Sequence, residues 1–146
     1  MRRTTDSDVR NFILRKMKTV FITGASGTMG AEALTQIAWT GKFLCRVLLR
    51  PKKANIRLAK KLQKNKLIEV IFGDIQNYDD CLTAVKGADY VLHCAAIIPP
   101  AADHNPDETF RTNRLGTENL LEAVAANGQI QKTKFVYIGT VAEYGN

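Results

Sequence analysis

The residues between Thr23 and Gly30 carry the clearest chemical signal in this sequence. Glycines stand at positions 24, 27 and 30, after the short apolar run 19–22 and at the start of a helical pattern. The gap between the first two glycines is one residue longer than in G-x-G-x-x-G. Such glycines let the chain turn sharply off a strand and let a pyrophosphate approach the backbone. Because N–H groups at a helix N-terminus attract phosphates, we predict a dinucleotide at this turn.

Alternating apolar runs and helical patterns must position this turn. Strands are predicted at about 18–23, 44–49, 68–72, 89–95 and 133–138, and helices at 28–40, 54–64, 78–86 and 106–127. This alternation predicts an α/β fold with a parallel sheet. Because right-handed crossovers are strongly preferred, we expect a doubly wound, three-layer α/β/α architecture with strand order 3-2-1-4-5.

Residues able to contact a ligand follow the ends of the predicted strands. They are Gly24, Arg50, Asp74, Ala95 and Thr140. The carboxyl ends of parallel strands meet at one edge of a sheet, where ligands bind in this architecture. We therefore expect a cofactor at that edge, near the ends of the first and fourth strands.

Length and composition indicate one globular domain. With 146 residues, 45% of them hydrophobic and 24% charged, the chain can bury a core and is neither disordered nor collagen-like. We assign residues 1–17 as an N-terminal extension, with a short capped helix after residues 6–8. Residues 18–146 are assigned as the dinucleotide-binding domain.

The cysteines and the N-terminus favour a reducing cytoplasm. Cys45, Cys81 and Cys94 are odd in number and form no C-x-x-C pair, so we predict neither a disulfide framework nor a metal site. The apolar run 12–14 is too short for a signal peptide or a membrane span. We expect a cytoplasmic protein without a membrane partner.

The net charge of +7 is concentrated between Arg46 and Lys66. Nucleic acid, a phosphate ligand or a solvated helix face could each account for it. We favour a solvated face for Arg57, Lys60, Lys61 and Lys64, because interleaved aromatic residues and a recognition helix are missing from the sequence. We therefore expect no nucleic-acid partner.

The helix predicted at 106–127 carries polar residues on its apolar side. Asn105 can cap it and Pro106 suits its first position. The predicted buried stripe is Phe110, Asn113, Thr117, Leu120, Leu121 and Val124. Because a buried polar group needs a partner, Asn113 is a candidate for a structural or catalytic hydrogen bond toward the neighbouring strand.

Other conspicuous residues are interpreted as structural. We predict that His93 is a hydrogen-bonded core histidine and that His104 is exposed. Trp39 is interpreted as core or packing surface. Cys94 lies near the expected cofactor, but no neighbour in the sequence would lower its pKa, so we assign it a packing role.

Four segments together resemble the extended short-chain dehydrogenase/reductases, the NAD-dependent epimerase/dehydratase group. They are the T-G-x-x-G-x-x-G turn at 23–30, the acidic turn 73–75, the H-x-A-A segment at 93–96 and the N-x-x-G-T-x-N-L segment at 113–120. The resemblance extends from about Thr19 to Asn146 and implies a Rossmann-like fold that binds NAD or NADP.

A fifth segment, 135–145, resembles that family's fifth strand and the loop ending in a Tyr-Gly pair. Thr140 occupies the place of the catalytic Ser/Thr, although Gly139 stands where the family often has serine. The resemblance implies that Thr140 hydrogen-bonds a substrate hydroxyl or carbonyl. The family's Tyr-x-x-x-Lys motif would follow this segment, and neither Tyr137 nor Tyr144 has a lysine four residues later. We expect these residues to bind a dinucleotide without supplying the acid/base pair.

The resemblance also implies which residues contact the cofactor. They are Gly24, Ser26, Gly27, Thr28, Met29, Gly30, Arg50, Asp74, Ile75, Cys94, Ala95 and Ala96. Asp74 would contact the edge of the adenine ring, or alternatively close a turn or cap the next helix.

Arg50 bears on the choice of cofactor. An acidic residue near the end of the second strand commonly holds the ribose 2′-hydroxyl of NAD, whereas arginine accommodates the 2′-phosphate of NADP. The segment 48–53 contains Arg50 and two lysines but no carboxylate. We therefore predict a preference for NADP over NAD.

The resemblance implies an oxidoreductase, epimerase or dehydratase acting at a carbinol or carbonyl carbon, in a nucleotide sugar or another small alcohol. A non-catalytic NAD(P)-sensing module is the alternative, and a basic nucleic-acid-interacting domain is a weaker one. If no strand follows, the fifth strand leaves an exposed sheet edge. We then expect homo-oligomers to form through residues 134–138.

Overall fold

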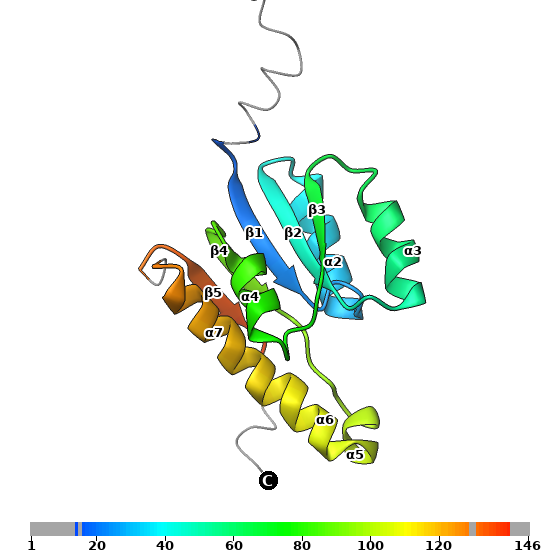
Figure 1. Ribbon diagram of the computed structural model, residues 1–146. Coiled ribbons are helices and arrows are strands. Elements are labelled where there is room, and N and C mark those ends of the chain that lie inside the picture. The colour runs from blue at the N-terminus through cyan, green and yellow to red at the C-terminus, as the bar shows by residue number, and fades with distance from the viewer. Residues whose placement is uncertain (1–13, 15, 129–130, 141–146) are drawn as a thin grey trace, which may run out of the picture.

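The computed structural model describes residues 14, 16–128 and 131–140. The helix predicted after residues 6–8 and the Tyr-Gly pair at 144–145 lie outside the described residues. Five parallel strands form one sheet, and Figure 1 shows them side by side. They are β1 (Lys18–Thr23), β2 (Phe43–Leu49), β3 (Ile68–Phe72), β4 (Tyr90–His93) and β5 (Lys134–Tyr137). Their order, β3-β2-β1-β4-β5, confirms the predicted fold.

Helices cover both faces of the sheet. On one face are α2 (Thr28–Trp39) and α3 (Lys53–Leu62), and on the other are α4 (Tyr78–Val85) and α7 (Gly116–Ala126). The side chains of β1 contribute alternately to two hydrophobic cores, because successive side chains of a strand point to opposite faces. Val20 and Ile22 join the core under α2 and α3, whereas Phe21 joins the other. The predicted three layers are thereby confirmed.

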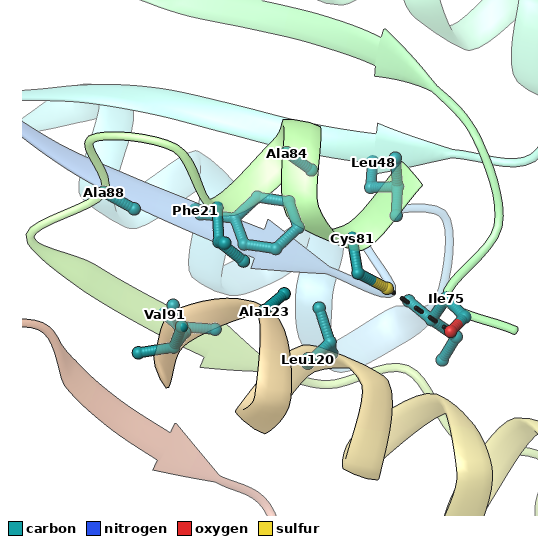
Figure 2. Packing of buried hydrophobic residues seen from close by; sticks show 11 residues of the cluster. Phe21, Leu48, Ile75, Cys81, Ala84, Ala88, Val91, Leu120 and Ala123 are labelled. Atoms are coloured by element: carbon teal, nitrogen blue, oxygen red, sulfur yellow. Dashed lines mark hydrogen bonds between the residues drawn. The ribbon is translucent and has the colours of Figure 1, made fainter. Parts of the chain in front are cut away.

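The core beneath α4 and α7 supports the functional edge of the sheet. Figure 2 shows Phe21 between Ala84 of α4 and Ala123 of α7, with Leu120 nearby. Cys81 lies at the end of this cluster and its Sγ donates to the Ile75 carbonyl at 3.3 Å. Burial raises the pKa of the Cys81 thiol to about 12, with Asp80 and Asp74 adding to the effect. Cys81 is therefore a packing residue.

The predicted continuous helix 106–127 is wrong in one respect, because a π-helical turn interrupts it. The segment consists of α6 (Pro106–Phe110), the π-turn η1 (Arg111–Leu115) and α7. The Gly116 N–H donates to the Arg111 carbonyl, five residues back. A short helix, α5 (Ala101–His104), precedes it in a segment expected to be loop. Asn105 precedes α6 without a side-chain capping bond.

The extra residue of the π-turn changes which side chains face the core. Phe110 and Leu121, both predicted to be buried, are 52% and 47% exposed. Leu120 and Val124 are buried as predicted, and Ala123, which was not in the predicted stripe, is buried as well. Because a π-turn adds a residue to the turn, α6 and α7 do not share one continuous apolar stripe.

Three smaller predictions have clear outcomes. Trp39 is 90% exposed, so its assignment to the core is wrong. It occupies the last position of α2. His104 is exposed as predicted. The fourth strand ends at His93 and not at 95, which leaves Cys94 and Ala95 in the loop that follows.

The surface of the described part offers no membrane span and no metal site. Within the described residues, no helix is long and apolar enough to cross a membrane. The same residues include no cluster of three metal-ligating side chains. Arg57, Lys60, Lys61 and Lys64 are all exposed, as expected of a solvated face. β5 is an edge strand of the described sheet, and association through it stays a prediction.

Candidate dinucleotide site

Two of the three glycines in the first turn are required by the fold itself. Gly24 has φ of +73°, and a Cβ there would lie 2.7 Å from the Ala95 nitrogen. A Cβ on Gly30 would lie 2.3 Å from the Gly24 carbonyl oxygen. Any other residue at either position would therefore displace the backbone that joins β1 to α2.

Gly27 differs from both. Its backbone is extended, with φ of −92°, and a Cβ would meet the Gly24 carbonyl oxygen only at 3.4 Å. The fold alone would accept alanine at this position. Gly27 is exposed and lines a cleft. The space left by its missing side chain therefore points to a molecule that approaches the backbone from outside.

The N-termini of α2 and α3, which lie near this turn, are suited to binding anions. Neither α2 nor α3 has a side-chain cap or an acidic residue in its first turn. By contrast, Asn77 caps α4 by accepting from the Asp79 and Asp80 N–H groups, and both aspartates lie in its first turn. Uncapped N–H groups and the partial positive charge of a helix N-terminus bind anions. The α2 and α3 ends can thus hold phosphates, whereas α4 supplies its own carboxylates.

Two adjoining hollows lie at the carboxyl edge of the sheet, and the predicted site residues line them. We call the first the Arg50 cleft, and its predicted members are Gly24, Ser26, Gly27, Arg50, Asp74, Ile75, Cys94, Ala95 and Ala96. We call the second the Thr140 cleft, and it adds Thr28, Met29, Gly30, Asn113 and Thr140. Gly24, Gly27 and the segment 94–97 line both clefts. All of the predicted residues therefore come together at one edge.

Sequence reasoning missed several residues of these clefts. Asn55 lines the Arg50 cleft, and its Nδ2 donates to the Arg50 carbonyl at 2.9 Å. Thr112 lines the same cleft from the π-turn and is buried. Asn55 lies in the first turn of α3, which has no side-chain cap, and this position could have marked it as a site residue. Thr112 had no such signal, because only the π-turn brings it to the cleft.

Asn113 fastens the loop that follows β4. Its Oδ1 accepts from the Ile97 N–H at 2.7 Å, and its Nδ2 donates to the Ile97 carbonyl at 2.8 Å. The predicted hydrogen bond of Asn113 therefore reaches a loop and not the strand. This paired contact holds the 94–97 segment against both clefts, so Asn113 is a positioning residue.

A directed chain of hydrogen bonds runs through His93. The Ala95 N–H donates to Thr23 Oγ1, and the Thr117 hydroxyl donates to the Asn113 carbonyl. Thr117 must then accept from His93 Nε2, at 2.8 Å, which leaves His93 Nδ1 to accept from the Thr23 hydroxyl at 2.6 Å. His93 is thus a neutral core histidine, as predicted. Burial lowers its pKa to about 4.

Asp74 closes the turn after β3. Its Oδ1 accepts from the Gln76 N–H at 3.0 Å, and its own N–H donates to Asp80 Oδ2 at 2.9 Å. The turn-closing alternative is therefore confirmed. Because Asp74 also lines the Arg50 cleft, a contact with the adenine ring stays a prediction. Cys94 is half-buried, and burial raises the pKa of its thiol, as expected of a packing residue.

Comparison with known proteins shows the family to which this chain belongs. The sequence profile of the NAD dependent epimerase/dehydratase family matches residues 20–146, which include both clefts. The chain belongs to this family. Its described fold is accordingly the Rossmann-like dinucleotide-binding portion of an epimerase/dehydratase-family protein.

Relatives of this epimerase/dehydratase-family chain are considerably longer. An uncharacterized membrane protein of Methanocaldococcus jannaschii is 34% identical over 91% of this chain and 38% of its own length. A UDP-glucose 4-epimerase of Rickettsia bellii is 34% identical over 75% of this chain and 33% of its own length. The crystal structure of Pen from Bacillus thuringiensis is 33% identical, with a TM-score of 0.71 over 82% of this chain and 37% of its own. The chain therefore spans about a third of the length of these relatives.

Proposed function

We propose that this chain forms the NAD(P)-binding part of an enzyme that oxidises, epimerises or dehydrates a nucleotide sugar or another small alcohol. The observation that carries the proposal is Gly27, whose missing side chain is not required by the fold but opens the cleft beside an uncapped helix. A UDP-glucose 4-epimerase among the relatives supports the nucleotide-sugar class. When bound, the nicotinamide would accept and return a hydride.

Three features of the Arg50 cleft support the predicted preference for NADP over NAD. Arg50 follows β2 with its side chain 41% exposed, and Asn55 holds its carbonyl. The uncapped N-terminus of α3 begins three residues later, without an acidic residue in its first turn. Charge-assisted contacts to phosphate are about twice as strong as neutral ones. We infer that Arg50 and the start of α3 hold the 2′-phosphate.

Arg50→Met tests this choice because it removes the charge and keeps most of the apolar stem. We expect the Kd for NADPH to rise about tenfold and the Kd for NADH to stay unchanged, since only NADPH carries the 2′-phosphate. Titration of the purified protein with each dinucleotide measures both values. The matched control is Lys61→Met in the last turn of α3, which removes the same charge far from the cleft. Equal losses for both dinucleotides would contradict the NADP preference.

Thr140 belongs to the proposed reaction. It is exposed at the end of the segment that follows β5, and it lines a hollow of about 590 Å³ together with Met29 and Asn113. A hollow of this size is typical of small-molecule sites. We infer that the Thr140 hydroxyl hydrogen-bonds the substrate oxygen at the carbon that exchanges hydride.

In a longer enzyme that contains this chain, Thr140→Val is expected to lower kcat about tenfold with a nucleotide-sugar substrate, because one hydrogen bond to the reacting oxygen is lost. Thr140→Ser keeps the hydroxyl and should retain most of the activity. Turnover is followed by NAD(P)H absorbance or by product analysis. If that longer protein binds dinucleotides but turns over no nucleotide sugar or alcohol, the non-catalytic sensing alternative is favoured.

A further inference from the structure

The Arg50 side chain already faces a carboxylate. Its Nη1 lies 3.9 Å from Glu108 Oε1, although Arg50 follows β2 and Glu108 belongs to α6. Both side chains are partly exposed, at 41% and 37%. The contact brings an anion from a separate helix to the cation that would receive a 2′-phosphate.

Other residues hold Glu108 in this place. Gln76 Nε2 donates to Glu108 Oε1 at 2.8 Å and to Thr112 Oγ1 at 2.9 Å. Arg111 Nη2 lies 3.4 Å from Glu108 Oε2. Both hydrogens of the Gln76 amide are thus used, and one fixes the carboxylate beside Arg50. The bond from Gln76 lowers the pKa of Glu108, as does Arg111, so Glu108 is ionised at neutral pH.

We propose that Glu108 determines cofactor specificity, because its carboxylate competes with the 2′-phosphate of NADP for Arg50. This inference rests on the proposed dinucleotide-binding function. A 2′-phosphate carries nearly two negative charges and would share Arg50 with Glu108. The 2′-hydroxyl of NAD has no charge and meets no such competition. Glu108 therefore weakens the binding of NADP and leaves that of NAD unaffected.

Glu108→Gln tests the proposal with little change in shape. The amide oxygen of glutamine can still accept from Gln76, while the negative charge is lost. We expect the Kd for NADPH to fall about threefold to tenfold and the Kd for NADH to stay unchanged. The matched control is Glu118→Gln, which loses the same charge from α7, where Glu118 pairs with Arg114 at 3.0 Å. This control should leave the ratio of the two constants as it is.

Two further variants separate competition for Arg50 from other effects. In an Arg50→Met background, Glu108→Gln should tighten NADPH binding much less, because no guanidinium remains to be shared. Gln76→Leu releases the carboxylate without removing it, and we expect a smaller shift in the same direction. It also provides a test if Glu108→Gln does not fold.

The outcomes distinguish this inference from the function on which it rests. An unchanged ratio of the two constants in Glu108→Gln and in Gln76→Leu would overturn the role of Glu108 and leave dinucleotide binding established. Equal tightening of NADPH and NADH would also overturn it. If the unmodified protein binds neither dinucleotide, the proposed function fails as well.

Discussion

Gly27→Ala is expected to weaken dinucleotide binding about a hundredfold while the protein stays folded. The added methyl group would occupy the cleft where a pyrophosphate must approach the N–H groups at the start of α2. Loss of one or two charge-assisted hydrogen bonds, each contributing about 1.5–3 kcal/mol, gives an effect of this size. Folding is preserved because the new Cβ meets the Gly24 oxygen only at 3.4 Å.

Gly41→Ala provides a control with the opposite pattern. Gly41 has φ of +66° and open space around its Cβ position, outside both clefts. Alanine there should reduce the free energy of unfolding by about 1 kcal/mol and leave dinucleotide affinity unchanged. Titration with NADPH and thermal unfolding of both variants would show whether Gly27→Ala loses affinity but not stability, and Gly41→Ala stability but not affinity. Undiminished binding by Gly27→Ala would remove the main support for the proposed site.

Acidification should destabilise the protein through His93. Burial lowers the pKa of His93 to about 4, whereas an unfolded histidine titrates near 6.5. Between these values the unfolded state binds the additional proton, so the free energy of unfolding falls as the pH falls. The contribution of His93 is fully present above about pH 6.5 and lost by about pH 4. It amounts to about 3 kcal/mol.

The shift of the His93 pKa follows from its burial among uncharged side chains. Its ring hydrogen-bonds the hydroxyl groups of Thr23 and Thr117 and lies against the rings of Phe135 and Tyr137. Denaturant unfolding at pH values from 7 to 4 measures the effect. A His93→Gln variant should start less stable and show a flatter profile over this interval. An equally steep profile in the variant would assign the pH dependence to other groups.

The general plan of the fold follows from local sequence patterns. Apolar runs alternate with helical segments, and the right-handed crossover rule then leaves the observed strand order. The glycine turn was equally predictable from its spacing after an apolar run. Gly30 meets backbone atoms of Gly24 and Ala25 within the same strand–turn–helix unit, whereas Gly24 meets Cys94 and Ala95 of the loop after β4. Residues after strand ends share one edge of a parallel sheet by geometry alone.

The details of the site depended on contacts between distant segments. A π-turn inserts one residue into a helix that otherwise keeps its apolar positions, so periodicity cannot reveal it. In that turn, Thr112 faces the Arg50 cleft and Asn113 fastens Ile97.

Local sequence patterns specify the sheet, its strand order and the glycine turn at which we propose that a dinucleotide binds, because these depend on patterns repeated within a few residues. The partners of the polar residues follow from long-range packing. Arg50 meets Glu108 and His93 bridges Thr23 and Thr117 because the chain returns to the same edge of the sheet from separate elements. Such contacts depend on how the elements pack against one another, which no local sequence pattern encodes.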